Sequence, residues 1–178
     1  MVRKERRRRP VVWRAAGLGL ALISWTLVSG RPLNAAEDPL RKGIEYFEAQ
    51  RYGEAIGLFR SIAEKEKDNH EAFFYLGKAY FLEKRFPSSI EWLEKAVLLQ
   101  PRNSQYHYWL ARANEARFQK AGLLSKMKYG KRFRDEVQLA VRLDGNNLDA
   151  RFWLMVFYLT SPRSFGGDIA KGLEQAAE

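Results

Sequence analysis

The feature that most constrains this chain is a sequence pattern that recurs at one fixed spacing. The spacing is about 34 residues, the length of a unit that holds two helices. It holds for small and large residues alike, because it separates Gly43 from Gly77, Ala55 from Ser89, and Tyr46 from Tyr80. Within each unit the apolar residues fall three and four positions apart, which is the spacing of one helix face. One such unit cannot bury its apolar face alone, so several units must stack.

The stretch from residue 70 to residue 101 shows what one unit contains. Two runs of apolar residues predict two helices with one buried face each: Phe73, Leu76 and Tyr80 in the first, and Leu93, Ala96 and Val97 in the second. Gly77 and Ser89 are small at the points where the two helices should come closest. Pro101 cannot continue a helix, so the second helix should end just before it.

The recurrence predicts an all-α fold of about 3.5 stacked helix–turn–helix hairpins. The expected repeats cover about 37–69, 70–103, 104–147 and 148–178. The third is too long, because its closing turn at 144–147 follows the turn at 101–104 by more than one repeat length. We expect about ten extra residues between its two helices, somewhere from Phe118 to Lys131. The fourth is incomplete and ends on a short helix expected over 169–177, which a longer chain or another molecule should cover.

Residues 1–36 are expected to be a secretory signal peptide. A basic segment is followed by fourteen uncharged residues from Ala15 to Val28, and Ala35 and Ala36 are small enough for cleavage. An uncleaved membrane anchor is the alternative, although a spanning helix needs about 20 apolar residues and Arg14 interrupts this one. A soluble basic tail is a third reading.

The region from residue 37 onward resembles the tetratricopeptide-repeat superfamily. More narrowly, it is similar to a group of exported bacterial repeat proteins with a long basic insertion in the third repeat, here residues 119–128. Their fourth repeat has a glycine-rich loop, here residues 158–167, with Arg163 in place of a glycine. The resemblance implies a right-handed superhelix that binds other proteins and carries out no chemistry. It also implies the periplasm or cell envelope, with inner-membrane anchoring through residues 15–28 as the alternative.

In such superhelices the first helix of each repeat lines a concave groove. The candidate partner-binding residues lie one turn apart on these helices: Ile44, Phe47, Phe74, Lys78, Tyr108, Arg112, Phe152 and Val156. Aromatic residues with interleaved Lys and Arg suit an extended or helical peptide of acidic character, and Tyr and Arg are enriched at binding hot spots. The alternative is that Phe74, Tyr108 and Phe152 pack between adjacent repeats.

One variant of this fold clamps the carboxyl terminus of chaperones with Lys and Asn side chains. At the corresponding positions this chain has Leu40 with Ile44, and Phe74 with Lys78. Binding of a chaperone tail is therefore not expected.

A second candidate surface is the basic insertion, with the residues Lys120, Lys126, Lys128, Lys131, Arg132 and Arg134. Eight Lys and Arg residues lie between Arg112 and Arg134 against one acid, Glu115, and apolar residues are interleaved. Such a segment suits anionic lipid headgroups or an acidic protein. The alternative is a solvated charged face. Nucleic acid is not an expected partner, because residues 1–36 hold eight of the 31 basic residues and the rest of the chain has a net charge of only +3.

The sequence carries no motif for catalysis. There is no cysteine, and the two histidines are His70, in a turn between repeats, and His107, in an aromatic position where packing is the expected role. Metal-ligand spacings, phosphate-binding loops and nucleophile motifs are also missing from the sequence. We therefore expect a non-enzymatic protein-binding scaffold with no cofactor, no metal and no small-molecule substrate. A component tethered at a membrane surface and an accessory region of a larger enzyme are the alternatives.

Overall fold

The structure, a computed structural model, describes residues 38–177, without the side chains of residues 123 and 124. The expected signal peptide or anchor at 1–36 lies outside these residues. The described part contains eight α-helices and one short 3-10 helix: α1 (Pro39–Glu48), α2 (Tyr52–Lys65), α3 (His70–Leu82), α4 (Phe86–Leu99), α5 (Ser104–Gln119), α6 (Leu123–Leu143), α7 (Leu148–Thr160), η1 (Arg163–Phe165) and α8 (Ile169–Ala177). The all-α prediction is confirmed, and the last helix occupies the predicted residues.

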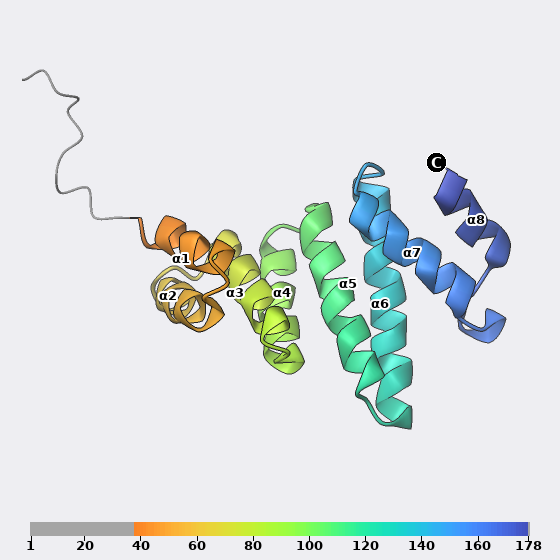
Figure 1. The fold of residues 1–178 in the computed structure, drawn as a ribbon, viewed down its shortest axis with the longest axis horizontal. Coiled ribbons are helices and arrows are strands. Elements are labelled where there is room, and N and C mark those ends of the chain that lie inside the picture. Colours follow the sequence, from red (N-terminus) through yellow and green to blue (C-terminus); the bar gives the residue numbers. More distant parts are fainter. Residues whose placement is uncertain (1–37, 178) are drawn as a thin grey trace, which may run out of the picture. The chain divides into compact units, whose positions relative to one another are not determined.

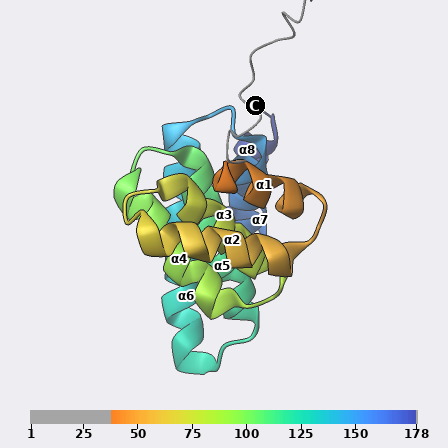
Figure 2. The same cartoon turned by 90° about the vertical axis from the view of Figure 1, so that its left-hand side faces the viewer.

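The helices pack in consecutive pairs, α1 with α2, α3 with α4, α5 with α6 and α7 with α8. Each pair also contacts the next pair in the chain, so the elements follow one another in sequence order in Figure 1, and Figure 2 shows the same helices superposed in the view turned by 90°. This arrangement corresponds to about four hairpins rather than the expected 3.5, since α8 completes the last pair.

The starts of the first helices have a common cause. Asp38, Asn69, Asn103 and Asn147 precede α1, α3, α5 and α7, and the side chain of each accepts a hydrogen bond from a backbone N–H in the first turn of its helix. These N-caps satisfy donors that a helix leaves unpaired at its start. The chain therefore marks the beginning of every hairpin with the same local chemistry.

The close approach predicted at the small residues is present in the first two hairpins. A Cβ atom on Gly43 would lie 2.5 Å from Cε1 of Phe59, and a Cβ on Gly77 would lie 2.6 Å from Cγ of Leu93. Phe59 and Leu93 are themselves one repeat length apart and are both fully buried. Ser89 is buried as well. The residues that recur in the sequence therefore make equivalent packing contacts in the two hairpins.

The structure corrects the prediction for the third repeat. The extra residues do not form a connection between two helices of ordinary length; they lengthen α5 to 16 and α6 to 21 residues, with a link of only three residues. Their Lys, Leu and Met content favours helix. Gly130 of α6 lies against Phe118 of α5, where a Cβ would come within 3.3 Å of the ring, so the two extensions pack together.

His107 has the packing role expected of it and also joins α5 to α6. The side chain is buried, with Nε2 2.9 Å from the Pro101 carbonyl oxygen and Nδ1 2.6 Å from a carboxylate oxygen of Glu136. Both partners only accept, so the ring makes both hydrogen bonds when it is protonated. Burial lowers the pKa of His107, but the hydrogen bonds to Glu136 and Pro101 outweigh burial and raise this pKa above its ordinary value.

The raised pKa of His107 predicts that stability falls as the pH rises. A group whose pKa is higher in the folded state stabilises the fold below its unfolded pKa, about 6.5 for histidine, and loses this contribution as the pH passes the folded pKa. Unfolding free energies from urea titrations at pH 6 and pH 9 should show the loss, and His107→Gln should remove it. His70→Gln is the matched control, because the His70 ring pairs with the Tyr106 hydroxyl instead. An unchanged pH dependence in His107→Gln would contradict the assignment.

Candidate functional site

The predicted groove residues all lie on the first helices of the four hairpins. Ile44 and Phe47 come from α1, Phe74 and Lys78 from α3, Tyr108 and Arg112 from α5, and Phe152 and Val156 from α7. Tyr108 is buried, Phe152 is 53% exposed, and the other six are partly buried. Phe74 stacks on Tyr106 of the next hairpin, with ring centroids 4.4 Å apart. This contact agrees with the alternative prediction that Phe74 packs between adjacent repeats.

Lys78 is surrounded by aromatic rings from three helices. Its Nζ lies 4.8 Å from the ring centroid of Trp109 in α5 and 5.0 Å from that of Phe47 in α1, with Phe74 and Tyr75 of its own helix at 5.1 and 5.3 Å. Burial lowers the pKa of this amine. Within residues 38–177, Lys78 forms no ion pair, so its charge is balanced only by the ring faces.

Arg112 repeats this arrangement one hairpin later. It lies one repeat length after Lys78, with its guanidinium carbon 3.5 Å from the ring centroid of Trp153 in α7 and 5.8 Å from that of Phe81 in α3. Burial lowers its pKa, and the charges of Glu115 and Asp149 oppose that effect without forming an ion pair. Nη1 is buried and has no hydrogen-bond partner among the described residues.

The sequence reasoning found the two cations and two of the rings around Lys78, those of Phe47 and Phe74. It missed the rings of Tyr75, Trp109 and Trp153. The same position of the repeat is occupied by Tyr75, Trp109 and Trp153. One ordinary repeat length separates Tyr75 from Trp109, and the greater length of the third repeat separates Trp109 from Trp153. The signal was therefore present in the same recurrence that identified Gly77. It was overlooked because each of these residues directly follows a predicted groove position and is not itself one.

The basic insertion is only partly neutralised by neighbouring acids. Arg132 pairs with Glu94 of α4, and Arg134 pairs with Asp135 at 2.9 Å. The amines of Lys120, Lys126 and Lys128 lie over aromatic rings, at 5.0 Å from Phe86, 5.5 Å from Phe118 and 5.8 Å from Tyr129 respectively. In the described part of the chain, none of these three lysines, nor Lys131, has an ion-pair partner.

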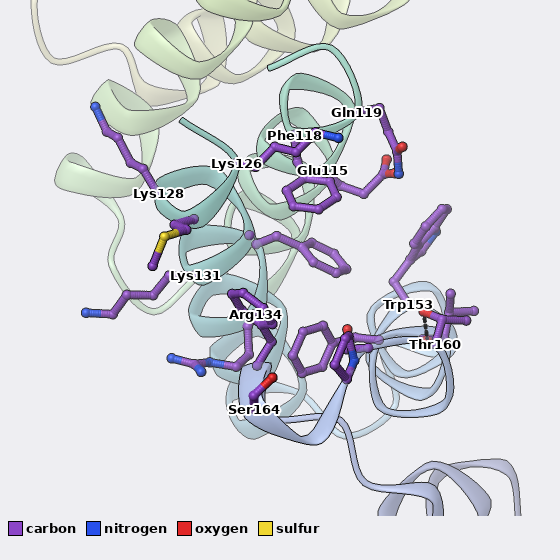
Figure 3. A pocket seen from close by; sticks show the side chains of 18 residues that line it. Glu115, Phe118, Gln119, Lys126, Lys128, Lys131, Arg134, Trp153, Thr160 and Ser164 are labelled. Atoms are coloured by element: carbon purple, nitrogen blue, oxygen red, sulfur yellow. Dashed lines mark hydrogen bonds between the residues drawn. The ribbon is translucent and has the colours of Figure 1, made fainter. Parts of the chain in front are cut away.

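A cavity of about 820 Å³ opens beside the groove, between the lengthened α5 and α6, the helix α7 and the loop that follows it. Trp153 and Val156 belong both to the groove face of α7 and to this cavity, and Lys126 extends at its edge (Figure 3). The sequence analysis named four of its lining residues, Lys126, Lys128, Lys131 and Arg134, as part of a basic surface, but it did not predict a cavity.

Residues 38–177 contain neither a candidate metal site nor a candidate membrane-spanning helix. No group of three or more His, Cys, Asp and Glu side chains there could hold a metal ion. No helix in the same range is both long and apolar enough to cross a membrane.

Comparison with known proteins supports the repeat architecture. Residues 40–101 match a family model described as tetratricopeptide repeat. No curated protein matches the chain. Among solved structures, MamA from Desulfovibrio magneticus RS-1 is similar with a TM-score of 0.64, 18% identity, and coverage of 79% of this chain and 72% of that one.

Two further solved structures are described by their peptide-binding sites. YrrB, a tetratricopeptide-repeat protein with an unusual peptide-binding site, has a TM-score of 0.61 at 18% identity, over 78% of this chain and 64% of its own. The first such domain of Spaghetti (RPAP3), bound to the HSP90 peptide SRMEEVD, has a TM-score of 0.58 at 22% identity. The match covers 67% of this chain and 86% of that one. At these identities the similarity establishes the fold alone.

Proposed function

We propose that this chain, whose residues 40–101 match the tetratricopeptide-repeat model, is a non-enzymatic scaffold that holds an acidic peptide segment of a partner protein against its first helices. The observation that carries the proposal is the pair Lys78 and Arg112. Both are partly buried cations, both are held by aromatic rings, and neither has an ion-pair partner in the described chain.

The energetic argument concerns the cost of leaving these charges without partners. Removing a cation from water is unfavourable unless it is paired or hydrogen-bonded, and ring faces compensate this cost only in part. A carboxylate placed between Lys78 and Arg112 would supply the missing partner, including an acceptor for the buried Nη1 of Arg112. The surrounding tryptophan, tyrosine and phenylalanine rings would exclude water from this contact, as hot-spot residues do.

The peptide-binding relatives support the class of partner and not its identity. The Spaghetti domain binds an HSP90 peptide with two glutamates and an aspartate, so a protein of this fold accommodates an acidic segment. We do not propose a chaperone tail for the present chain, since Leu40 with Ile44, and Phe74 with Lys78, stand where the chaperone-binding variant has Lys and Asn.

The proposed place of action is outside the cytoplasm, in the periplasm or cell envelope. Support comes from the order of residues 1–36, a basic segment, an uncharged stretch and small residues. Amino-terminal sequencing of the protein from an envelope fraction tests this part, because a first residue near 36 or 37 indicates cleavage and an intact Ala15–Val28 indicates an anchor.

A peptide array tests the proposed partner class. Immobilised short peptides of acidic, neutral and basic character, each with and without aromatic residues, should retain the full chain only when acidic. Lys78→Met/Arg112→Met keeps the aliphatic packing and removes both charges, and should weaken the best acidic peptides by about tenfold or more. The control Lys65→Met/Arg102→Met removes the same charge from exposed positions and should leave binding unchanged. Equal losses in both variants would mean that net charge, and not the groove, attracts the peptides.

A further inference from the structure

The cavity beside α7 exists because the third hairpin is longer than its neighbour. The last residues of α5 and the first turns of α6 extend beyond α7, and the loop at 161–165 closes one side. The partly open space of about 820 Å³ lies within the range of about 300–1,000 Å³ typical of pockets for small molecules. Its size therefore suits a small ligand better than a helix of a partner protein.

The walls of the cavity are mainly apolar and aromatic. The large apolar side chains that line it are Phe118, Met127, Phe133, Trp153, Phe157 and Phe165. Two of them remain exposed, Met127 at 59% and Phe165 at 54%, and both lie on segments that border the opening. Exposed large apolar side chains next to a lined cavity favour an apolar ligand group over water.

Two of the polar side chains in the wall, Gln119 and Thr160, are already engaged in hydrogen bonds. The Gln119 amide donates to Glu115, and the Thr160 hydroxyl donates to the backbone carbonyl of Val156 at 2.7 Å (Figure 3). An inserted peptide backbone would bring N–H and C=O groups that need partners, and this wall offers little to satisfy them. An alkyl or aryl group has no such need.

Positive charge borders the cavity on one side only. Lys126, Lys128, Lys131 and Arg134 all come from α6, and the three lysines have no ion-pair partner among the described residues. Figure 3 shows Lys128 and Lys131 on the side of α6 away from Trp153 and Thr160. Lys126 lies over the Phe118 ring, between that charged edge and the aromatic wall. A ligand with an apolar tail and an anionic head would thus be oriented with its head at α6.

We propose that this cavity is a binding site for a single-chain anionic amphiphile, with the tail among Phe118, Trp153 and Phe157 and the carboxylate at Lys126. The proposal does not rest on the acidic-peptide function, since it uses a different set of cations, although Trp153 contributes to both sites. It assigns a role to the lengthening of the third hairpin, which the groove itself does not need.

The test uses three probes that separate head from tail, below their micelle-forming concentrations. Isothermal titration of the full chain should show saturable binding of dodecanoate, and at least about tenfold weaker binding of dodecyltrimethylammonium and of butyrate. Lys126→Glu should weaken dodecanoate binding by about tenfold or more. Lys65→Glu, which changes the net charge equally at an exposed site, should not.

Two additional measurements locate the ligand. A dodecanoate analogue with a photoreactive group at the tail end should crosslink to peptides that contain residues 118, 153 or 157. Val156→Phe, which fills part of the cavity and is checked by circular dichroism for intact helices, should reduce both crosslinking and affinity. Crosslinks confined to residues 1–37, or equal binding of the two head groups, would overturn the proposal. Binding to vesicles of phosphatidylglycerol without binding of monomeric dodecanoate would also overturn it and would point to a membrane surface instead.

Discussion

Replacing Gly77 by alanine is expected to destabilise the protein by about 1–3 kcal/mol, the usual cost of adding a carbon to a close-packed contact. The new Cβ would lie 2.6 Å from Cγ and 2.9 Å from Cδ2 of Leu93, and 3.2 Å from the backbone nitrogen of Leu93. The backbone contact cannot be relieved by a side-chain rotation, so α3 and α4 would have to move apart. Such a shift would disturb the second hairpin at its centre, where Leu76 and Leu93 are fully buried.

Gly57 provides the matched control for the same substitution. It lies in α2, is exposed, and has nothing within 4 Å of an added Cβ. Gly57→Ala should therefore stabilise the protein, by up to about 1 kcal/mol, because alanine is the better helix former. Urea unfolding followed by circular dichroism measures both variants, and the two substitutions should have opposite signs.

A double-mutant cycle attributes the effect to the contact with Leu93. Leu93→Ala alone should cost about 2–5 kcal/mol, because it leaves a cavity in the core. In Gly77→Ala/Leu93→Ala the new methyl group enters that cavity, so the combined loss should be smaller than the sum of the single losses. Strict additivity would mean that Gly77→Ala destabilises the protein through something other than the contact with the Leu93 side chain.

The first two hairpins were predictable because their determinants are local and recur. Gly43 and Gly77, with Phe59 and Leu93 opposite them, appear at a fixed spacing in the sequence and at equivalent contacts in the structure. The helix starts were readable for the same reason, as at Asp38, where the capping side chain precedes Pro39.

The third hairpin was not predictable in the same way, because excess length does not reveal its own conformation. The extra residues at 118–131 are compatible with a loop, with a third short helix or with two longer helices, and helix propensity alone is a weak guide. The choice depends on whether the extensions find a surface to cover, here Phe118 against Gly130. The cavity beside α7 could not be predicted for a related reason, because it lies where α7 leaves the extensions of α5 and α6 uncovered.

The candidate site was predicted in part. Lys78 and Arg112 were named because they continue the frame of the first helices, whereas their burial and lack of ion-pair partners are tertiary facts. Trp109 and Trp153 reach these cations from the following hairpin. Contacts between repeats depend on how one hairpin is rotated against the next, which a one-dimensional spacing does not specify.

The second large effect is expected at the junction of the third and fourth hairpins, where Asn147→Ala should destabilise the protein by about 1.5–5 kcal/mol, the sum of a lost helix cap and a lost buried hydrogen bond. Asn147 caps α7 by accepting from the Ala150 N–H, and its Nδ2 donates to the Ser104 hydroxyl at 2.8 Å. The Ser104 hydroxyl in turn donates to the Ala140 carbonyl oxygen at 2.8 Å. Losing the cap costs about 0.5–2 kcal/mol, and leaving a buried hydroxyl without its donor adds about 1–3 kcal/mol.

Asn69→Ala separates these two contributions. Asn69 caps α3 in the same way, by accepting from the Ala72 N–H, but its Nδ2 donates to Glu66 at an exposed position. Asn69→Ala should therefore lose only the cap. Its unfolding free energy should fall by less than the unfolding free energy of Asn147→Ala. If the two variants lose the same stability, the hydrogen bond to Ser104 contributes nothing. If Asn147→Ala costs more, and Ser104→Ala/Asn147→Ala costs less than the sum of its single variants, the buried hydrogen bonds of Ser104 join α7 to α5 and α6 and contribute to stability.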